Sequence, residues 1–81
     1  MDPSYLKDLL CRGREVEFEY YAKRYVVSRV EYPSMYEYAF GPKWGTKYTS
    51  KYFEDILYRN YFGDTLSTML GRLDRSRFYV C

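Results

Sequence analysis

Few residues of this chain could do catalytic chemistry, because its 81 residues include no histidine and only two cysteines, Cys11 and Cys81. The lack of histidine excludes Ser-His and Cys-His nucleophile systems and most zinc sites. The cysteines stand near opposite ends of the sequence, and no CxxC, GxGxxG or P-loop motif occurs. We therefore predict that the protein is not an enzyme and uses no cofactor and no metal.

The acidic residues that could act in general acid-base chemistry form a row. Glu15, Glu17 and Glu19 alternate with apolar residues, so they should share one face of a strand, whereas a glycosidase needs two acids across a cleft. We interpret the row as a solvated stripe that Arg24 and Arg29 of the next strand neutralise. The alternative is an acidic face that meets a basic partner surface.

Aromatic side chains are the unusual part of the composition. Twelve Tyr, five Phe and one Trp make up 22% of the chain, more than one small core needs. Tyr and Trp are enriched at binding hot spots, and Trp44 stands in a loop bounded by Gly and Pro. We predict a partner-binding surface made of Trp44, Tyr36, Tyr38, Tyr48, Lys43 and Lys47. The alternative is that Tyr36, Tyr38 and Phe40 line the core while Trp44 covers one end of it.

Cations and rings also mix around this loop, as they do where single-stranded nucleic acid is held. The chain carries 13 basic and 11 acidic residues, a net charge of +2. Its basic residues are spread from Lys7 to Arg77 among acids, whereas nucleic-acid domains usually cluster them. Binding to nucleic acid should therefore be weak.

The hydrophobic periods predict helices and strands in one small domain over residues 1–81. Asp2 and Pro3 favour a helix over residues 3–12, which Gly13 ends. Alternation predicts strands at residues 15–20 and 24–30, paired so that Phe18 faces Tyr25. The Tyr-Ala pair between them is a poor tight turn, so a longer loop is an alternative.

Further strands are expected at residues 36–40, 47–49 and 77–81, with helices after Ser50 and after Asp64. The order α-β-β-β-α-α-β predicts an α+β fold, with a three- or four-stranded antiparallel sheet and helices packed on one face. Cys11 should be buried and Cys81 exposed. The predicted core is Leu6, Leu9, Leu10, Val16, Phe18, Tyr25, Val27, Ile56, Leu57, Leu66, Leu70 and Phe78.

The sequence carries no feature of export or membrane insertion. It has no apolar run near 18 residues, and its Met-Asp-Pro-Ser opening lacks the basic and apolar regions of a signal peptide. We expect a cytoplasmic protein with reduced thiols and no membrane partner.

Residues 9–20, with Lys23-Arg24-Tyr25, form a pattern of a leucine pair, a Gly-Arg-Glu, an alternating strand and a basic residue before Tyr. This pattern resembles small uncharacterised proteins of Gram-positive bacteria and their phages. Residues 53–57 and 63–70 are similar to the helix pair of those proteins. The chain departs from them at Tyr21-Ala22, where they often have Asn-Gly. The resemblance implies no reaction and no catalytic residue.

These observations favour a non-enzymatic protein-binding or inhibitory module from a bacterium or mobile element. Smallness, the missing catalytic chemistry and the resemblance suggest one concrete form, a phage-type inhibitor of a host defence system such as an anti-CRISPR protein. A nucleic-acid-binding accessory or regulatory protein is the alternative function. The expected partner is a protein, and the sequence leaves a homodimer open.

Overall fold

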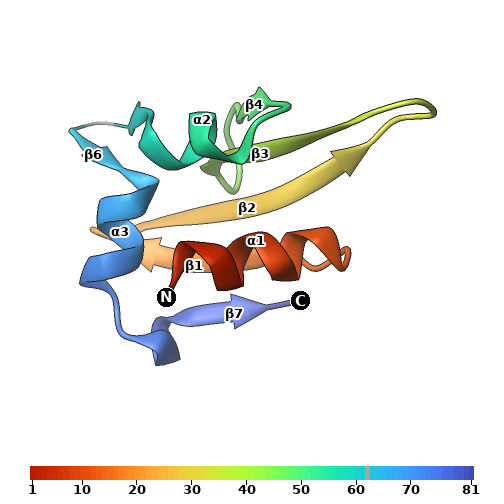
Figure 1. The fold of residues 1–81 in the computed structure, drawn as a ribbon. Coiled ribbons are helices and arrows are strands. Elements are labelled where there is room, and N and C mark those ends of the chain that lie inside the picture. Colours follow the sequence, from red (N-terminus) through yellow and green to blue (C-terminus); the bar gives the residue numbers. More distant parts are fainter. Residues whose placement is uncertain (62) are drawn as a thin grey trace.

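The computed structural model describes residues 1–61 and 63–81. Three helices, seven strands and one short 3-10 helix follow one another along this part of the chain (Figure 1). Their bounds are α1 (Pro3–Cys11), β1 (Val16–Tyr20), β2 (Lys23–Glu31), β3 (Tyr36–Pro42), β4 (Tyr48–Ser50), α2 (Phe53–Tyr58), β5 (Asn60–Tyr61), β6 (Asp64–Thr65), α3 (Leu66–Arg72), η1 (Arg75–Arg77) and β7 (Phe78–Val80).

The sheet has five antiparallel strands in the order β4-β3-β2-β1-β7, and β5 and β6 form a separate two-stranded ribbon. The α+β class is as predicted, but the prediction of three or four strands is wrong in count. The count differs because both short strands, β4 and β7, join the sheet as its edges. The separate ribbon was not predicted, since strands of two residues such as β5 and β6 are too short to show a period. The predicted register of the first hairpin is confirmed, because Phe18 pairs with Tyr25 and Glu19 with Arg24.

The core lies between one face of this sheet and the helices. Successive strand side chains point to opposite faces, so Phe18 of β1 and its cross-strand neighbours share the inner face. The Phe18 ring lies 5.7 Å from the ring of Tyr25, 6.1 Å from that of Phe40 and 5.3 Å from that of Phe78, centroid to centroid. The apolar residues of α1, α2 and α3 join the same cluster, so all three helices cover this face. All twelve predicted core residues are buried.

The helix ends follow local hydrogen-bonding chemistry. Asp2 caps α1 by accepting from the backbone N of Ser4 at 2.8 Å, and this hydrogen bond lowers the pKa of the Asp2 carboxyl. The third helix is capped by Thr65, and Asp64 instead accepts from the hydroxyl of Tyr20 at 2.8 Å. The prediction that Cys11 is buried is wrong, because Leu6, Leu9 and Leu10 form the inner stripe of α1 and Cys11 lies outside it. Cys81 is exposed, as predicted. None of the described helices has the length and apolar character needed to span a membrane.

The turn between β1 and β2 contains only Tyr21 and Ala22, so the alternative of a longer loop is wrong. Both residues adopt left-handed backbone angles, with φ of 49° and 63°. A two-residue turn of this kind favours Asn-Gly, because side chains with a Cβ are strained there. Arg72 of α3 holds the turn by donating to the Tyr20 hydroxyl at 2.7 Å.

The β2–β3 hairpin extends beyond the rest of the molecule, and Figure 1 shows it projecting past the end of α1. In the described structure, β1 pairs with β2 only as far as Val27, and β4 pairs with β3 only from Tyr38 to Phe40. We call the extension, residues 28–37, the arm. Its turn is closed by the backbone N of Tyr32, which donates to the carbonyl of Met35 at 2.8 Å.

Candidate functional site

The sheet face opposite the helices, here called the open face, carries side chains of a different kind from the core. Strand alternation directs Glu17 of β1, Arg24 and Val26 of β2, and Tyr79 of β7 to this face. Ala39 of β3 also points there. Apart from Val26, charged and small residues occupy its centre, where a second core would need several large apolar ones.

One chain of contacts crosses the open face from the β7 edge to the loop after β3. The Glu17 carboxylate lies 3.0 Å from the Lys43 ammonium and 3.8 Å from the Arg24 guanidinium. Arg24 in turn lies 5.4 Å from the ring centroid of Tyr79, and Lys43 lies 5.4 Å from that of Trp44. We call these five residues the open-face cluster. It places two rings on either side of one shared carboxylate, each beside a cation.

The loop that carries Trp44 is fixed by its own polar contacts. The Lys47 ammonium donates to the carbonyl of Lys43 at 2.8 Å and to that of Gly45 at 3.1 Å. Gly41 lies directly beneath the loop, because a Cβ on this glycine would come within 2.8 Å of the Thr46 carbonyl oxygen. The Trp44 side chain nevertheless remains 83% exposed. Trp44 therefore covers no core, and its backbone is held in place before any partner arrives.

Electrostatics keep the centre of the cluster ionised. The hydrogen bond from Lys43 lowers the pKa of the Glu17 carboxyl, with smaller help from Arg24, and burial opposes the shift without cancelling it. Cys81 adds a weak contact, its Sγ lying 3.7 Å from Glu17 Oε2. The cluster thus holds a carboxylate between two cations at neutral pH.

The structure separates the six residues predicted to form one partner-binding surface. Trp44, Lys43 and Lys47 lie together in the loop beside the open face. Tyr38 is only 2% exposed and packs its ring 5.4 Å from that of Phe53, so its assignment to a surface is wrong.

Tyr36 and Tyr48 point toward the helix side of the sheet. Tyr36 shares the side of Tyr38 on β3, with the Arg29 guanidinium 4.8 Å from its ring, and Tyr48 packs against the core with Arg59 at 3.9 Å. Neither ring therefore shares a surface with Trp44. Of the alternative interpretation, Tyr38 and Phe40 do line the core, whereas Tyr36 is 45% exposed and Trp44 covers no part of the core.

The acidic row divides in a similar way. Glu17 joins Lys43 and Arg24, while Glu15 and Glu19 are exposed. The prediction that Arg29 neutralises the row is wrong, because Arg29 lies on the opposite face of β2 and pairs with Glu31. The open-face cluster therefore combines part of the predicted aromatic surface, Trp44 and Lys43, with part of the alternative acidic face, Glu17.

Sequence reasoning missed Tyr79 as a functional candidate. The alternation of Phe78, Tyr79 and Val80 could have placed it on the outer face, but a three-residue strand at the end of the sequence gave no reason to pair it with Glu17. The residue pairing of β1 with β7 makes that neighbourhood visible.

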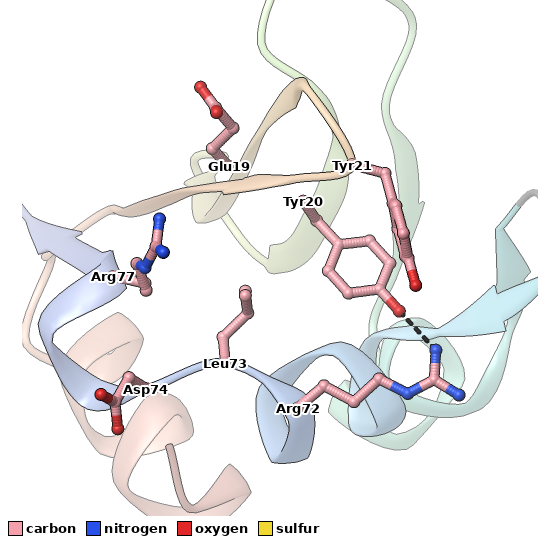
Figure 2. A pocket seen from close by; sticks show the side chains of 7 residues that line it. All are labelled: Glu19, Tyr20, Tyr21, Arg72, Leu73, Asp74 and Arg77. Atoms are coloured by element: carbon pink, nitrogen blue, oxygen red, sulfur yellow. Dashed lines mark hydrogen bonds between the residues drawn. The ribbon is translucent and has the colours of Figure 1, made fainter.

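A separate pocket of about 570 Å³ lies where the end of β1 meets the segment after α3 (Figure 2). Two arginines and two acids balance its charge, and Figure 2 shows Tyr20 directed toward Arg72. Burial and the bond to Asp64 raise the pKa of the Tyr20 hydroxyl, which disfavours its use as a base. Its lining is Glu19, Tyr20, Tyr21, Arg72, Leu73, Asp74 and Arg77. Within residues 1–61 and 63–81 no group of three or more His, Cys, Asp or Glu side chains could hold a metal ion.

Comparison with known proteins finds no matching family model, no matching curated protein and no matching solved structure. Function must therefore be argued from the surface chemistry of this chain.

Proposed function

We propose that the protein is a non-enzymatic binding module that docks a protein partner through the open-face cluster. The observation that carries the proposal is Trp44, an 83% exposed ring on a loop fixed by Lys47 and Gly41. A Trp that buries about 200 Å² offers several kcal/mol at roughly 25 cal/mol per Å² of apolar area. Because the loop is already ordered, less of this gain is lost to conformational entropy on binding.

Charge favours a protein over a nucleic acid as the partner. Phosphate binding depends on cations that displace counterions, but Glu17 already offsets one of the two positive charges of Lys43 and Arg24. Glu15 and Glu19 add negative charge beside the cluster. The matching surface would accept the Trp44 and Tyr79 rings in apolar recesses and pair with the flanking acids. The resemblance to proteins of Gram-positive bacteria and phages supports an inhibitory role, with a host defence protein as the target.

Nucleic-acid binding is a second candidate for one specific reason. Rings beside cations on the helix-free face of a sheet are how some small domains stack single-stranded bases. We expect only weak, salt-sensitive binding here, which fluorescence anisotropy with a labelled single strand at near-physiological salt would measure. Submicromolar affinity would make this the preferred function.

The test of protein binding is Trp44→Ala, measured for stability and for capture of partners from a Gram-positive lysate with and without nuclease. Tyr58→Ala is the matched control, because Tyr58 is an exposed ring on α2, whose buried residues join the core on the opposite face. We expect both variants to melt close to the wild type, with only Trp44→Ala losing the nuclease-resistant partner. Equal capture by wild type and Trp44→Ala, or a large fall in melting temperature for Trp44→Ala, would contradict the proposal.

A further inference from the structure

The pocket at the end of β1 combines a fixed aromatic wall with an apolar floor. The Tyr20 hydroxyl donates to Asp64 at 2.8 Å and accepts from Arg72 at 2.7 Å, so the Tyr20 ring is held in one orientation. Leu73 packs against the core but is only partly buried, and Figure 2 shows its side chain in the space between Tyr20 and Arg77. The volume of about 570 Å³ is typical of sites for small molecules.

One turn of the chain carries two opposite charges at one end of this pocket. Asp74 is the N-cap of η1 and Arg77 is its last residue, and the backbone N of Arg77 closes the turn by donating to the Asp74 carbonyl at 2.9 Å. Both side chains are exposed, and within residues 1–61 and 63–81 neither forms an ion pair or a side-chain hydrogen bond. A carboxylate and a guanidinium that are not paired with each other therefore stand on one turn beside the Leu73 floor.

The presence of both signs decides which class of ligand the pocket favours. A ligand with only negative charge would be attracted by Arg77 but repelled by Asp74 and by Glu19, which lines the same pocket. A ligand with only positive charge would be attracted by Asp74 but repelled by Arg77 and Arg72. A ligand that carries both charges places each beside its opposite, so its attractions are not offset in this way.

We propose that this pocket binds a free α-amino acid with an aromatic side chain. Its carboxylate pairs with Arg77 and its ammonium with Asp74, because the two ligand groups share one carbon and the two protein charges share one turn. The ligand's ring lies on Leu73 and against the Tyr20 ring, since aromatic rings attract one another in edge-to-face and offset-stacked arrangements. Tyr21 is 79% exposed and its ring lies 4.7 Å from that of Tyr20, so it is placed to cover the ligand.

The amino-acid site is independent of the proposed function. Its lining residues include none of the open-face cluster, so loss of a protein partner in Trp44→Ala and loss of the amino acid are separate results. Because the ligand bridges η1 and the end of β1 only in the folded protein, it should also raise the melting temperature as its concentration rises.

Analogues that lack one charge test the assignment. L-Phenylalanine is the probe, phenylpropanoate lacks its ammonium, and phenethylamine lacks its carboxylate. We expect phenylalanine to shift the NMR amide resonances of Leu73 and Arg77 and to leave that of Trp44 in place. Each analogue should bind about threefold to fivefold more weakly, as expected for the loss of one exposed ion pair. Glycine keeps both charges but should also bind more weakly, because it has no ring to bury.

Two substitutions locate the charges that the ligand contacts. Arg77→Gln should weaken phenylalanine binding about as much as removal of the ligand carboxylate does, and should not weaken binding of phenethylamine. Asp74→Asn should act in the same way on the ligand ammonium and should not weaken binding of phenylpropanoate. Both variants keep the backbone hydrogen bond of the turn, so both should fold. Arg75→Gln is the matched control, because the Arg75 guanidinium lies 5.3 Å from the ring centroid of Tyr5 and does not line the pocket.

Three results would overturn the proposal. The first is the lack of a saturable shift with phenylalanine at up to about 10 mM, a concentration that detects even weak binding. The second is an affinity for phenylpropanoate or phenethylamine equal to that for phenylalanine. The third is phenylalanine binding by Arg77→Gln and Asp74→Asn that is as tight as binding by Arg75→Gln.

Discussion

The two faces of the five-stranded sheet use the same strands for opposite purposes. On the inner face, rings contact rings, as where Phe40 lies 5.5 Å from Tyr25 and 4.5 Å from Tyr61. On the open face, Ala39 and Gly41 occupy the corresponding positions of β3, and the rings of Trp44 and Tyr79 stay at the margins beside cations. The two faces therefore use rings differently: on the inner face they pack against one another and stabilise the fold, and at the margins of the open face they stay exposed beside cations.

The largest difference between the two faces is expected for substitution of Phe18. Phe18 is fully buried and touches three other rings, so Phe18→Ala should destabilise the protein by about 3–5 kcal/mol. That is a large part of the stability of so small a domain. Thermal melting checks it against Tyr79→Ala on the open face, which should melt near the wild type. A shift of only a degree or two for Phe18→Ala would contradict the division of the two faces.

Substitution of Gly41 tests whether the open face is tightly packed where β3 meets the Trp44 loop. A Cβ there would lie 2.8 Å from the Thr46 oxygen and 2.9 Å from the Lys47 Cα, both backbone atoms, so the loop would have to move. We expect Gly41→Ala to cost about 1–3 kcal/mol. Gly71→Ala is the control, since Gly71 lies in α3 with open space around it and should gain about 0.5–1 kcal/mol. Equal melting temperatures for the two variants would refute the close contact.

The turn between β1 and β2 tests whether backbone strain, as well as side-chain packing, affects the stability of the sheet. Ala22 has a φ of 63°, which glycine adopts without strain. Ala22→Gly should therefore stabilise the protein by about 1 kcal/mol, as measured by urea denaturation. Ala39→Gly in β3 provides the opposite control, because glycine in a strand interior is destabilising. If Ala22→Gly is the less stable protein, the turn is not strained.

The smallest expected effect is the pH dependence of the open-face cluster. Because the pKa of Glu17 is lowered from its ordinary 4.5, its contribution is present above that value and is lost as the pH falls through the folded-state pKa. For an ion pair near the surface the contribution should stay below about 1 kcal/mol. Chemical denaturation between pH 7 and 3 should show a shallower acid loss for Glu17→Gln than for the wild type. Parallel profiles would mean that the Lys43 contact contributes nothing to folding.

Local patterns predicted much of this fold and less of its surface. Alternation around Phe18 and helical spacing around Leu9 gave the core, because burial repeats with the period of each element. The open-face cluster joins residues from β1, β2, β7 and the Trp44 loop, and no local pattern places Tyr79 beside Arg24. Tyr38 was assigned to the surface because ring counts were weighed above strand parity. Arg29 lies on the inner face because it shares the odd parity of Tyr25 and Val27 in β2, which its predicted role beside the acidic row did not take into account.

The Lys47 ammonium also gives the Trp44 loop a distinctive chemical reactivity. An amine that donates to two backbone carbonyls is a poorer nucleophile toward acylating reagents than an amine free in water. Acylation would also remove its charge and most of its donors, releasing the backbone that carries Trp44. The rate of Lys47 labelling therefore reports how well ordered the loop is. Acetylation of this one nitrogen would free the loop and with it the position of the Trp44 side chain.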